Sequence, residues 1–209
     1  MLRGDLAPCD KLIVWESTQS VHLLRELLAK TLHVPMSNVR VICMHLGGGF
    51  GSKGALDKHT VLAALASRRL GQPVKVVMER KEEACSQGNR PPNIITIRAG
   101  CKKDGTLTAL SLKSLGALGA YTHFWYETFC GYPLLMTYRC PNVRIEERQI
   151  FINADPDRSH RAPGFVQGIW AFEQVIDMLA GKCGVDPLKF RLHNYAEVAQ
   201  TPGNPPYTY

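Results

Sequence analysis

Long apolar runs and clustered cysteines are both missing from this sequence of 209 residues. No apolar stretch approaches the ~20 residues that a membrane-spanning helix needs, so we expect no membrane partner. The first ten residues, MLRGDLAPCD, lack the apolar centre of a secretory signal. The seven cysteines form no C-x-x-C pair and have no close histidine, so no metal ligands are assigned. An odd, scattered set of cysteines is typical of reduced thiols, which predicts a cytoplasmic location.

Dense basic runs are absent as well, although the chain has a formal charge of +7 and a pI near 9.1. The basic residues are spread along the chain, without the alternation of basic and aromatic residues that RNA-binding segments show. We therefore expect no nucleic-acid partner. The charge favours a solvated basic surface, an anionic ligand or an acidic partner subunit.

Glycine, by contrast, is concentrated in one segment, HLGGGFGSKG at residues 45–54. Five glycines in ten positions indicate a close approach of another group to the backbone, or a tight turn needed only for packing. The P-loop pattern fails, because Lys53 follows a serine and precedes a glycine. The dinucleotide pattern G-x-G-x-x-G matches at Gly49, Gly51 and Gly54, although the nearest suitable acidic residue, Glu79, lies 25 positions further on.

The hydrophobic pattern predicts an N-terminal βαβ-like half that contains this loop. Strands are expected at 11–16, 38–45 and 73–79, and helices at 18–32, capped by Ser17 or Thr18, and at 55–70, ended by Gly71. The second half predicts an antiparallel hairpin around Asp104-Gly105, a further strand at 141–153, and C-terminal helices after Gly164 and Asp186. The fold class is therefore α+β, as a single domain over 1–209 with two potential subdomains, 1–85 and 86–209.

Three segments together resemble the molybdenum-cofactor-binding region of the xanthine dehydrogenase and aldehyde oxidase family. They are STQ at 17–19, GGGFGSK at 47–53 and HRAPG at 160–164, in the family's order. Phe50 follows Gln19 by 31 positions, a spacing typical of that family, and GAY at 119–121 and the PNVR strand fall between the second and third segments. The resemblance covers nearly the whole chain, so the G-x-G-x-x-G match becomes incidental under this interpretation.

The resemblance implies roles for individual residues. Gln19 would donate from its amide to an apical oxo ligand, and Arg161 would place its guanidinium near the molybdenum centre. Molybdopterin would lie against the backbone of the glycine segment, with no protein ligand on the metal. The cofactor-binding residues implied are Gly48, Gly49, Phe50, Gly51, Ser52, Arg161 and Ala162. Gln19, Phe50 and Arg161 should then surround one cavity.

The same resemblance implies part of a large subunit that hydroxylates an aldehyde or an N-heterocycle oxidatively. Gly54 stands where purine-oxidising members carry glutamate, which disfavours a purine. The general-base glutamate would belong to the remainder of the large subunit, and iron–sulfur clusters and FAD to partner chains. The pterin form stays open, the cytosine dinucleotide form included. We expect no activity from the chain alone. The alternatives are a nucleotide-binding dehydrogenase module using Gly49, Gly51 and Gly54, and a non-catalytic remnant.

Overall fold

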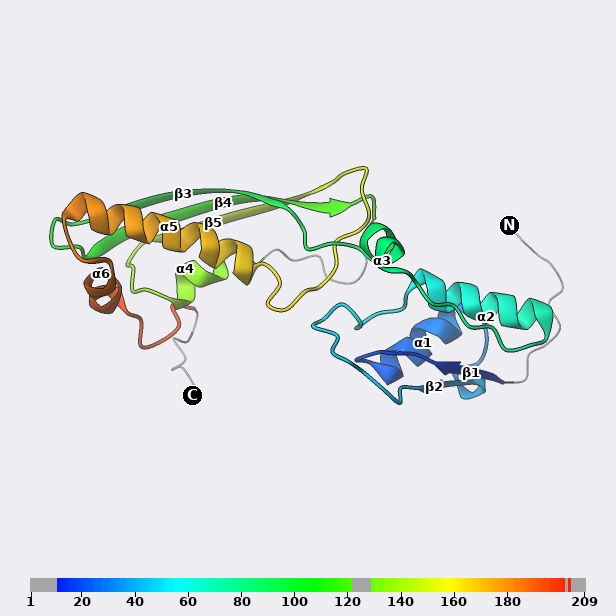
Figure 1. Cartoon of the computed structure of the whole chain (residues 1–209). Helices are drawn as coiled ribbons and strands as arrows, with labels where there is room; N and C mark the ends of the chain where they lie inside the picture. The colour runs from blue at the N-terminus through cyan, green and yellow to red at the C-terminus, as the bar shows by residue number, and fades with distance from the viewer. Residues whose placement is uncertain (1–10, 122–128, 202, 204–209) are drawn as a thin grey trace. The chain divides into compact units, whose positions relative to one another are not determined.

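The computed structural model describes residues 11–121, 129–201 and 203 (Figure 1). The chain divides into two compact units, each described here by itself. Unit 1 comprises residues up to Asn89 together with Arg158–Arg161, and unit 2 comprises Arg90–Asp157 and the residues from Ala162 onwards. The boundary after residue 89 differs from the one expected after residue 85, and the return of four residues to unit 1 has no counterpart in the sequence pattern.

Unit 1 is built on a parallel βαβ motif, as the hydrophobic pattern predicted. Strand β1 (Leu12–Trp15) pairs in parallel with β2 (Val39–Ile42), and α1 (Val21–Leu32) makes the crossover, followed by a short 3-10 turn, η1 (Met36–Asn38). Helix α1 packs on the two strands through the apolar side chains that recur along one of its faces. The buried core of this unit consists of Leu24, Leu28, Ala29, Val39 and Val41.

The glycine segment joins β2 to helix α2 (Lys58–Leu70), which Gly71 ends in the left-handed conformation as expected. A short helix, α3 (Arg80–Ser86), follows. The strand predicted at 73–79 is wrong, because the structure has no regular element there. Glu79 is instead the N-cap of α3 and forms a reciprocal capping box with Glu82. The β-branched residues of this run have strand propensity, but no described strand pairs with them.

The predicted cap of the first helix is also wrong in detail. The N-cap is Ser20, which makes no side-chain cap hydrogen bond. The Thr18 hydroxyl instead accepts from the Ser20 N–H at 3.1 Å and donates to the Lys53 carbonyl at 3.1 Å. This buried threonine therefore ties the start of α1 to the end of the glycine segment.

Unit 2 is a three-stranded sheet with helices packed on it. Strand β3 (Asn93–Cys101) pairs antiparallel with β4 (Leu107–Gly119), and β4 pairs in parallel with β5 (Val143–Phe151). The hairpin between β3 and β4 turns at Asp104-Gly105, where Gly105 has φ +88° and the Asp104 side chain accepts from the Thr106 N–H. Both observations confirm the turn that the sequence predicted.

Three helices supply the rest of unit 2: α4 (Tyr132–Met136), the long α5 (Phe165–Cys183) and α6 (Pro187–Asn194) (Figure 1). Asp186 caps α6 by accepting from the Lys189 N–H at 3.0 Å, with Pro187 in the first position, as expected. One core joins the sheet to these helices. Its buried members are Leu107, Leu110, Leu112, Leu134, Tyr138, Cys140, Phe172, Ile176, Ala180 and Phe190.

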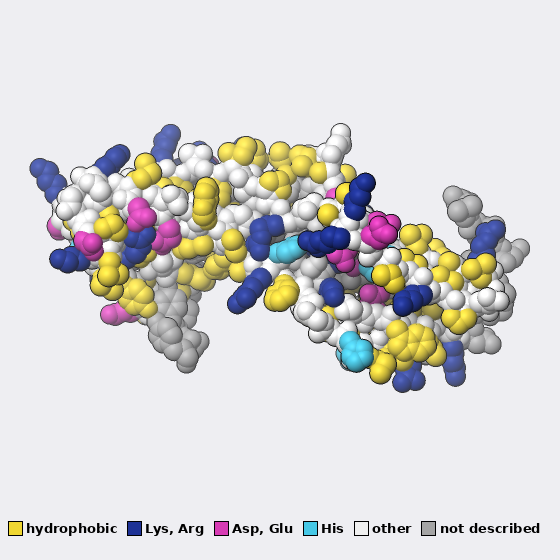
Figure 2. Space-filling view, in the orientation of Figure 1, with side chains coloured by type: hydrophobic (Ala, Val, Ile, Leu, Met, Phe, Trp, Pro, Cys, Tyr) yellow, Lys and Arg dark blue, Asp and Glu magenta, His cyan; other side chains and the backbone are white. Residues whose placement is uncertain are grey.

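Two features concern the nucleic-acid and membrane partners that the sequence did not lead us to expect: the distribution of basic side chains and the length of the apolar helices. Figure 2 shows basic side chains scattered over the visible face rather than gathered into one strip. No helix in the described part of the chain is long and apolar enough to span a bilayer. Most of the aromatic stretch at 121–132 lies outside the described residues.

Two glycines of α5 provide a matched test of the unit 2 packing. A Cβ on Gly168 would overlap the Cys130 backbone carbonyl, whereas a Cβ on Gly181 would meet nothing within 4 Å. We expect Gly168→Ala to lower the free energy of unfolding by about 1–3 kcal/mol through overpacking. Gly181→Ala should leave it unchanged or raise it by up to about 1 kcal/mol through helix propensity. Denaturant unfolding measures both, and equal effects would contradict the described helix packing.

Candidate functional site

The glycine segment is folded into an exposed loop by unusual backbone angles. Gly48 has φ +100°, Phe50 has φ 52° and Gly51 has φ +90°, and only glycine adopts such values without strain. Phe50 adopts the left-handed conformation that a residue with a side chain rarely takes, and it is 62% exposed. Two tight turns close the loop, since Ser52 N–H donates to the Gly49 carbonyl at 2.8 Å and Gly54 N–H to the Gly51 carbonyl at 3.2 Å.

Gln19 lies directly against this loop. The Gly51 N–H donates to Gln19 Oε1 at 2.9 Å, and the Gln19 N–H donates to the Lys53 carbonyl at 2.9 Å. A backbone N–H can only donate, so the amide oxygen of Gln19 must face it. The amide nitrogen then points away, and it has no hydrogen-bond partner among the described residues. The loop therefore orients two unused N–H donors.

Gly49 is required where Gln19 packs. A Cβ at this position would overlap the Gln19 side chain, from its oxygen back to Cγ. At Gly47, by contrast, a Cβ would meet nothing within 4 Å. The close approach that the glycines indicated is thus real at Gly49, and within this chain the approaching group is Gln19.

The segment 158–161 also packs against the loop residue Gly51. A Cβ on Gly51 would come within 2.9 Å of Ser159 Cβ, so the two segments are in van der Waals contact. Arg161, two residues further on, is exposed, and His160 carries a buried Nδ1 that has no hydrogen-bond partner in the described structure. Ala162 has φ 54° and belongs to unit 2.

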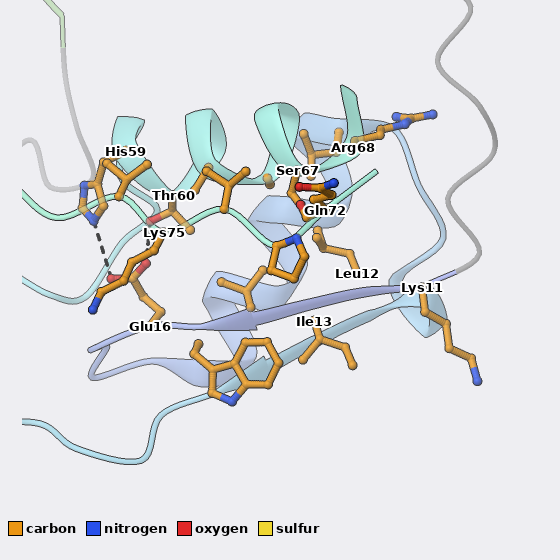
Figure 3. Close-up of a pocket in the computed structure, with 18 of the residues that line it drawn as sticks. Lys11, Leu12, Ile13, Glu16, His59, Thr60, Ser67, Arg68, Gln72 and Lys75 are labelled. Carbon is orange, nitrogen blue, oxygen red and sulfur yellow. Dashed lines mark hydrogen bonds and ion pairs between the residues drawn. The ribbon is translucent and has the colours of Figure 1, made fainter. Parts of the chain in front are cut away.

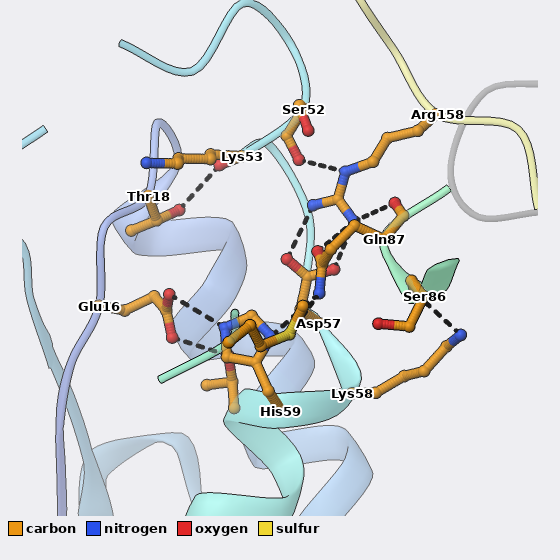
Figure 4. A network of polar contacts seen from close by, with 12 residues as sticks. Glu16, Thr18, Ser52, Lys53, Asp57, Lys58, His59, Ser86, Gln87 and Arg158 are labelled. Atoms are coloured by element: carbon orange, nitrogen blue, oxygen red, sulfur yellow. Dashed lines mark hydrogen bonds and ion pairs between the residues drawn. The ribbon is translucent and has the colours of Figure 1, made fainter. Parts of the chain in front are cut away.

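Arg158 holds this returning segment in place through a buried guanidinium (Figure 4). Its side chain is 4% exposed. Nη1 and Nη2 donate to the two carboxylate oxygens of Asp57 at 2.6 and 2.7 Å, and Nε donates to the Ser52 carbonyl at 2.6 Å. Nη1 also donates to the Gln87 carbonyl at 2.7 Å and to Gln87 Oε1 at 2.8 Å. This planar fork of donors matches a carboxylate in a way that lysine could not.

The ion pair explains an otherwise odd helix start. Asp57 is the N-cap of α2, a position where aspartate usually accepts from the first turn, yet its side chain makes no cap hydrogen bond. Both carboxylate oxygens are instead bound by Arg158. The side chain thus joins the end of the glycine loop to the segment that carries Arg161.

A second chain of contacts runs from Arg158 to β1. Because Arg158 fixes the Gln87 oxygen, the Gln87 amide nitrogen faces His59 Nδ1, 3.2 Å away, and donates to it. His59 Nε2 faces Glu16 Oε1 at 3.6 Å, and Thr60 donates to Glu16 Oε2 at 2.7 Å. These side chains are drawn together in Figure 4.

Glu16 and His59 shift each other's pKa values. Burial raises the pKa of Glu16, but hydrogen bonds from His59 and Thr60 outweigh it, so the pKa lies below the ordinary 4.5. The hydrogen bond to Glu16 raises the pKa of His59 above the ordinary 6.5 despite burial. The Gln87 donor at Nδ1 opposes this rise, because a protonated Nδ1 could no longer accept.

A cavity of unit 1 lies elsewhere, between β1, α2 and residues 71–76 (Figure 3). It measures about 850 Å³ and has mostly apolar walls, with Glu16, His59 and Thr60 at one end. Neither Gln19, Phe50 nor Arg161 lines it. The structure therefore brings Gln19 to the glycine loop, whereas a single cavity shared by all three residues stays a prediction.

Metal-binding clusters give no alternative centre, since the described residues contain no group of three or more His, Cys, Asp or Glu that could hold an ion. Lys53, at which the P-loop pattern failed, donates to the Ser17 hydroxyl at 2.9 Å. Sequence reasoning missed Arg158, Asp57 and Gln87. Asp57 before a helix and Arg158 near the HRAPG segment were visible, but nothing in the pattern showed that they meet.

A family model described as the molybdopterin cofactor-binding domain matches residues 6–195. The chain therefore belongs to the family of molybdopterin cofactor-binding domains, those of aldehyde oxidoreductase and xanthine dehydrogenase-type proteins. This assignment confirms the resemblance drawn from the three segments and removes the case for a dinucleotide fingerprint at Gly49, Gly51 and Gly54.

Individual relatives agree with the family. The chain is 38% identical over 190 residues to the aldehyde oxidoreductase molybdenum-binding subunit PaoC of Escherichia coli K12, covering 90% of this chain and 25% of that protein. It is 31% identical over 188 residues to the xanthine dehydrogenase molybdenum-binding subunit of Escherichia coli O157:H7, covering 88% and 25%. The chain thus spans about a quarter of the length of these relatives.

Solved structures agree on the fold. Quinoline 2-oxidoreductase from Pseudomonas putida 86 superposes with a TM-score of 0.85 at 29% identity, covering 95% of this chain and 25% of that one. The aldehyde oxidoreductase of Desulfovibrio gigas gives a TM-score of 0.81 at 26% identity, covering 96% and 22%.

The residues present fit a pterin cofactor. The loop offers the backbone of Gly48, Gly49 and Gly51, which carries no side chain of its own, and Gln19 offers two N–H donors without a partner among the described residues. Oxygen-rich groups are bound by such N–H donors.

We expect removal of the Arg158 guanidinium to be strongly destabilising. In Arg158→Met the Asp57 carboxylate, 14% exposed, loses the guanidinium that binds both of its oxygens. Such a loss costs about 3–5 kcal/mol of unfolding free energy. Arg80→Met is the control, since Arg80 is 91% exposed and should cost at most about 0.5 kcal/mol. The double variant Arg158→Met/Asp57→Leu should lose less than the sum of its single variants, and strict additivity would contradict the pair.

The Glu16–His59 pair predicts a specific pH dependence. A raised His59 pKa contributes stability that is complete below 6.5 and is lost as pH rises through the folded value. A lowered Glu16 pKa contributes stability that is complete above 4.5 and is lost as pH falls through the folded value. The difference in free energy of unfolding between the native chain and Glu16→Gln should therefore be largest between pH 4.5 and pH 6.5 and should decrease toward pH 8. An NMR titration should show the His59 pKa falling in Glu16→Gln, and a native value below 6.5 would show that the Gln87 donor prevails.

Proposed function

We propose that this chain forms one wall of the cofactor site in the molybdenum-binding subunit of a molybdenum hydroxylase. The observation that carries the proposal is the contact of Gln19 with the glycine loop. It leaves Phe50 and Gly51 exposed on the loop, and it leaves the two amide N–H donors of Gln19 without a partner among the described residues. The fold similarity and the family membership support it, and the role of each residue rests on the resemblance of its motif.

In this proposal Gln19 donates from Nε2 to an oxygen of the bound group, because its Oε1 is already held by Gly51. The loop backbone accepts the flat pterin where a side chain would block it, and Phe50 closes the loop with its ring exposed. Arg161 supplies a fixed fork of donors, and Ala162 adds backbone. When bound, the cofactor supplies the two-electron redox chemistry and the oxygen-transfer site.

The proposed reaction class is oxidative hydroxylation of an aldehyde or an N-heterocycle. Gly54, in place of the glutamate of purine-oxidising members, disfavours purines. The general base, iron–sulfur clusters and FAD would come from the remainder of the subunit and from partner chains. The cytosine dinucleotide form of the cofactor and a cytoplasmic location belong to the proposal as well.

A chimera tests the proposal where the missing parts are supplied. The matching quarter of the E. coli aldehyde oxidoreductase molybdenum-binding subunit is replaced by this chain, since 190 residues align. We expect bound molybdenum and pterin near one per chimera and little of either on the isolated chain. Gly49→Ala displaces Gln19 at small cost to the fold and should lower cofactor content about tenfold or more.

Two matched variants make the result specific. Gly47→Ala lies in the same loop, where a Cβ meets nothing, and should keep full cofactor content. Gln19→Glu keeps the acceptor for Gly51 but removes both N–H donors, so it should behave like Gly49→Ala. Full molybdenum and pterin content in both Gly49→Ala and Gln19→Glu would contradict the assigned role, as would stoichiometric loading of the isolated chain.

A further inference from the structure

Two cysteine sulfurs meet in unit 2, far from the glycine loop in sequence. Cys101 is the last residue of β3 and Cys183 is the last residue of α5. Their Sγ atoms lie 3.2 Å apart, although 82 positions separate them in the chain. Among the six cysteines that the structure describes, no other two are within hydrogen-bonding distance of each other.

Both cysteines are held where the contact requires them. Cys101 follows a register shift at the end of β3 and packs at the edge of the unit 2 core. Cys183 precedes Gly184, which ends α5 in the left-handed conformation with its N–H on the carbonyls of Ala180 and Gly181. The Cys183 thiol also lies 3.5 Å from the Lys102 carbonyl, an acceptor on the residue that follows Cys101. A strand end and a helix end thus meet through these thiols.

We propose that Cys101 and Cys183 form a reversible disulfide that fastens the end of α5 to the end of β3 under oxidising conditions. The oxidant is a disulfide of the glutathione class. One cysteine thiolate attacks the oxidant, forming a mixed disulfide and releasing one glutathione thiolate. The second cysteine then loses its proton and attacks the mixed disulfide, releasing the second glutathione. Two protein thiols are oxidised and one glutathione disulfide is reduced to two thiols.

The surroundings of the two cysteines make formation of this disulfide depend on the oxidant and on pH. Burial and the hydrogen bond with Cys183 raise the pKa of Cys101 to about 11. Cys101 therefore stays a thiol near neutral pH, and attack by the thiolate is slow. Proximity acts in the opposite direction, because closing the ring needs a movement of about 1 Å to reach the disulfide bond length of about 2.0 Å.

Trypsin separates the two cysteines cleanly, so the bond can be observed directly. The expected fragments are Ala99–Lys102 and Cys183–Lys189, each with one cysteine. The full chain is equilibrated with oxidised and reduced glutathione at pH 8.5, unfolded, alkylated and digested. We expect these two fragments linked, with a mass two hydrogens below their sum, and unlinked after reduction. The oxidised chain should also unfold at a midpoint about 5 °C or more above the reduced chain, because a long loop is closed.

Single variants separate this pair from random oxidation. Cys101→Ser and Cys183→Ser should each remove the linked fragment and leave glutathione on the remaining cysteine, whereas Cys85→Ser should leave the linked fragment unchanged. Cys85 is exposed and serves as the reference thiol. The proposal is overturned if Cys85 becomes glutathionylated while Cys101 and Cys183 are both alkylated, or if Cys85 is linked to either of them as often as they are to each other.

Discussion

A single buried cation organises unit 1. Arg158 comes from a segment 101 positions beyond Asp57, yet its guanidinium binds both oxygens of that carboxylate. The same group binds the carbonyls of Ser52 and Gln87, so the end of the glycine loop, the start of α2 and the residue after α3 meet on one side chain. Burying two charges is costly, and this cost is offset by the two hydrogen bonds between guanidinium and carboxylate and by the bonds to the Ser52 and Gln87 carbonyls. Such an arrangement fixes which segments meet more than it adds to stability.

The orientation of neighbouring groups follows from this cation. Arginine has no acceptor, so the Gln87 oxygen must face it and the Gln87 nitrogen must face His59. His59 then accepts at Nδ1, and its Nε2 faces Glu16, the residue that follows β1. Arg158 thus acts through Gln87 to determine which nitrogen of His59 carries the proton that faces Glu16. The Gly51 N–H orients the Gln19 amide in the same way, because a backbone N–H can only donate.

The parts of this structure that the sequence predicted are those decided locally. Gly71, Asp104-Gly105 and Asp186-Pro187 act through backbone angles and caps that need no distant partner. The glycine loop was found for the same reason. The failures are non-local: residues 73–79 have strand propensity without a strand to pair with, and Glu79 serves α3 instead. The sequence did not point to Arg158, because a buried ion pair leaves no periodicity in the sequence.

The groups at the glycine loop are suited to binding a ligand rather than to transferring protons. The loop presents backbone and the Gln19 amide, none of which titrates near neutral pH. The charged side chains beside it are already committed, Asp57 to Arg158 and Lys53 to the Ser17 hydroxyl. A proton acceptor for hydroxylation would therefore have to come from outside these contacts. This division suits a chain that spans a quarter of its relatives: the loop keeps its shape through Arg158 and Thr18, both within unit 1, while the proposal assigns the reacting groups to the rest of the subunit.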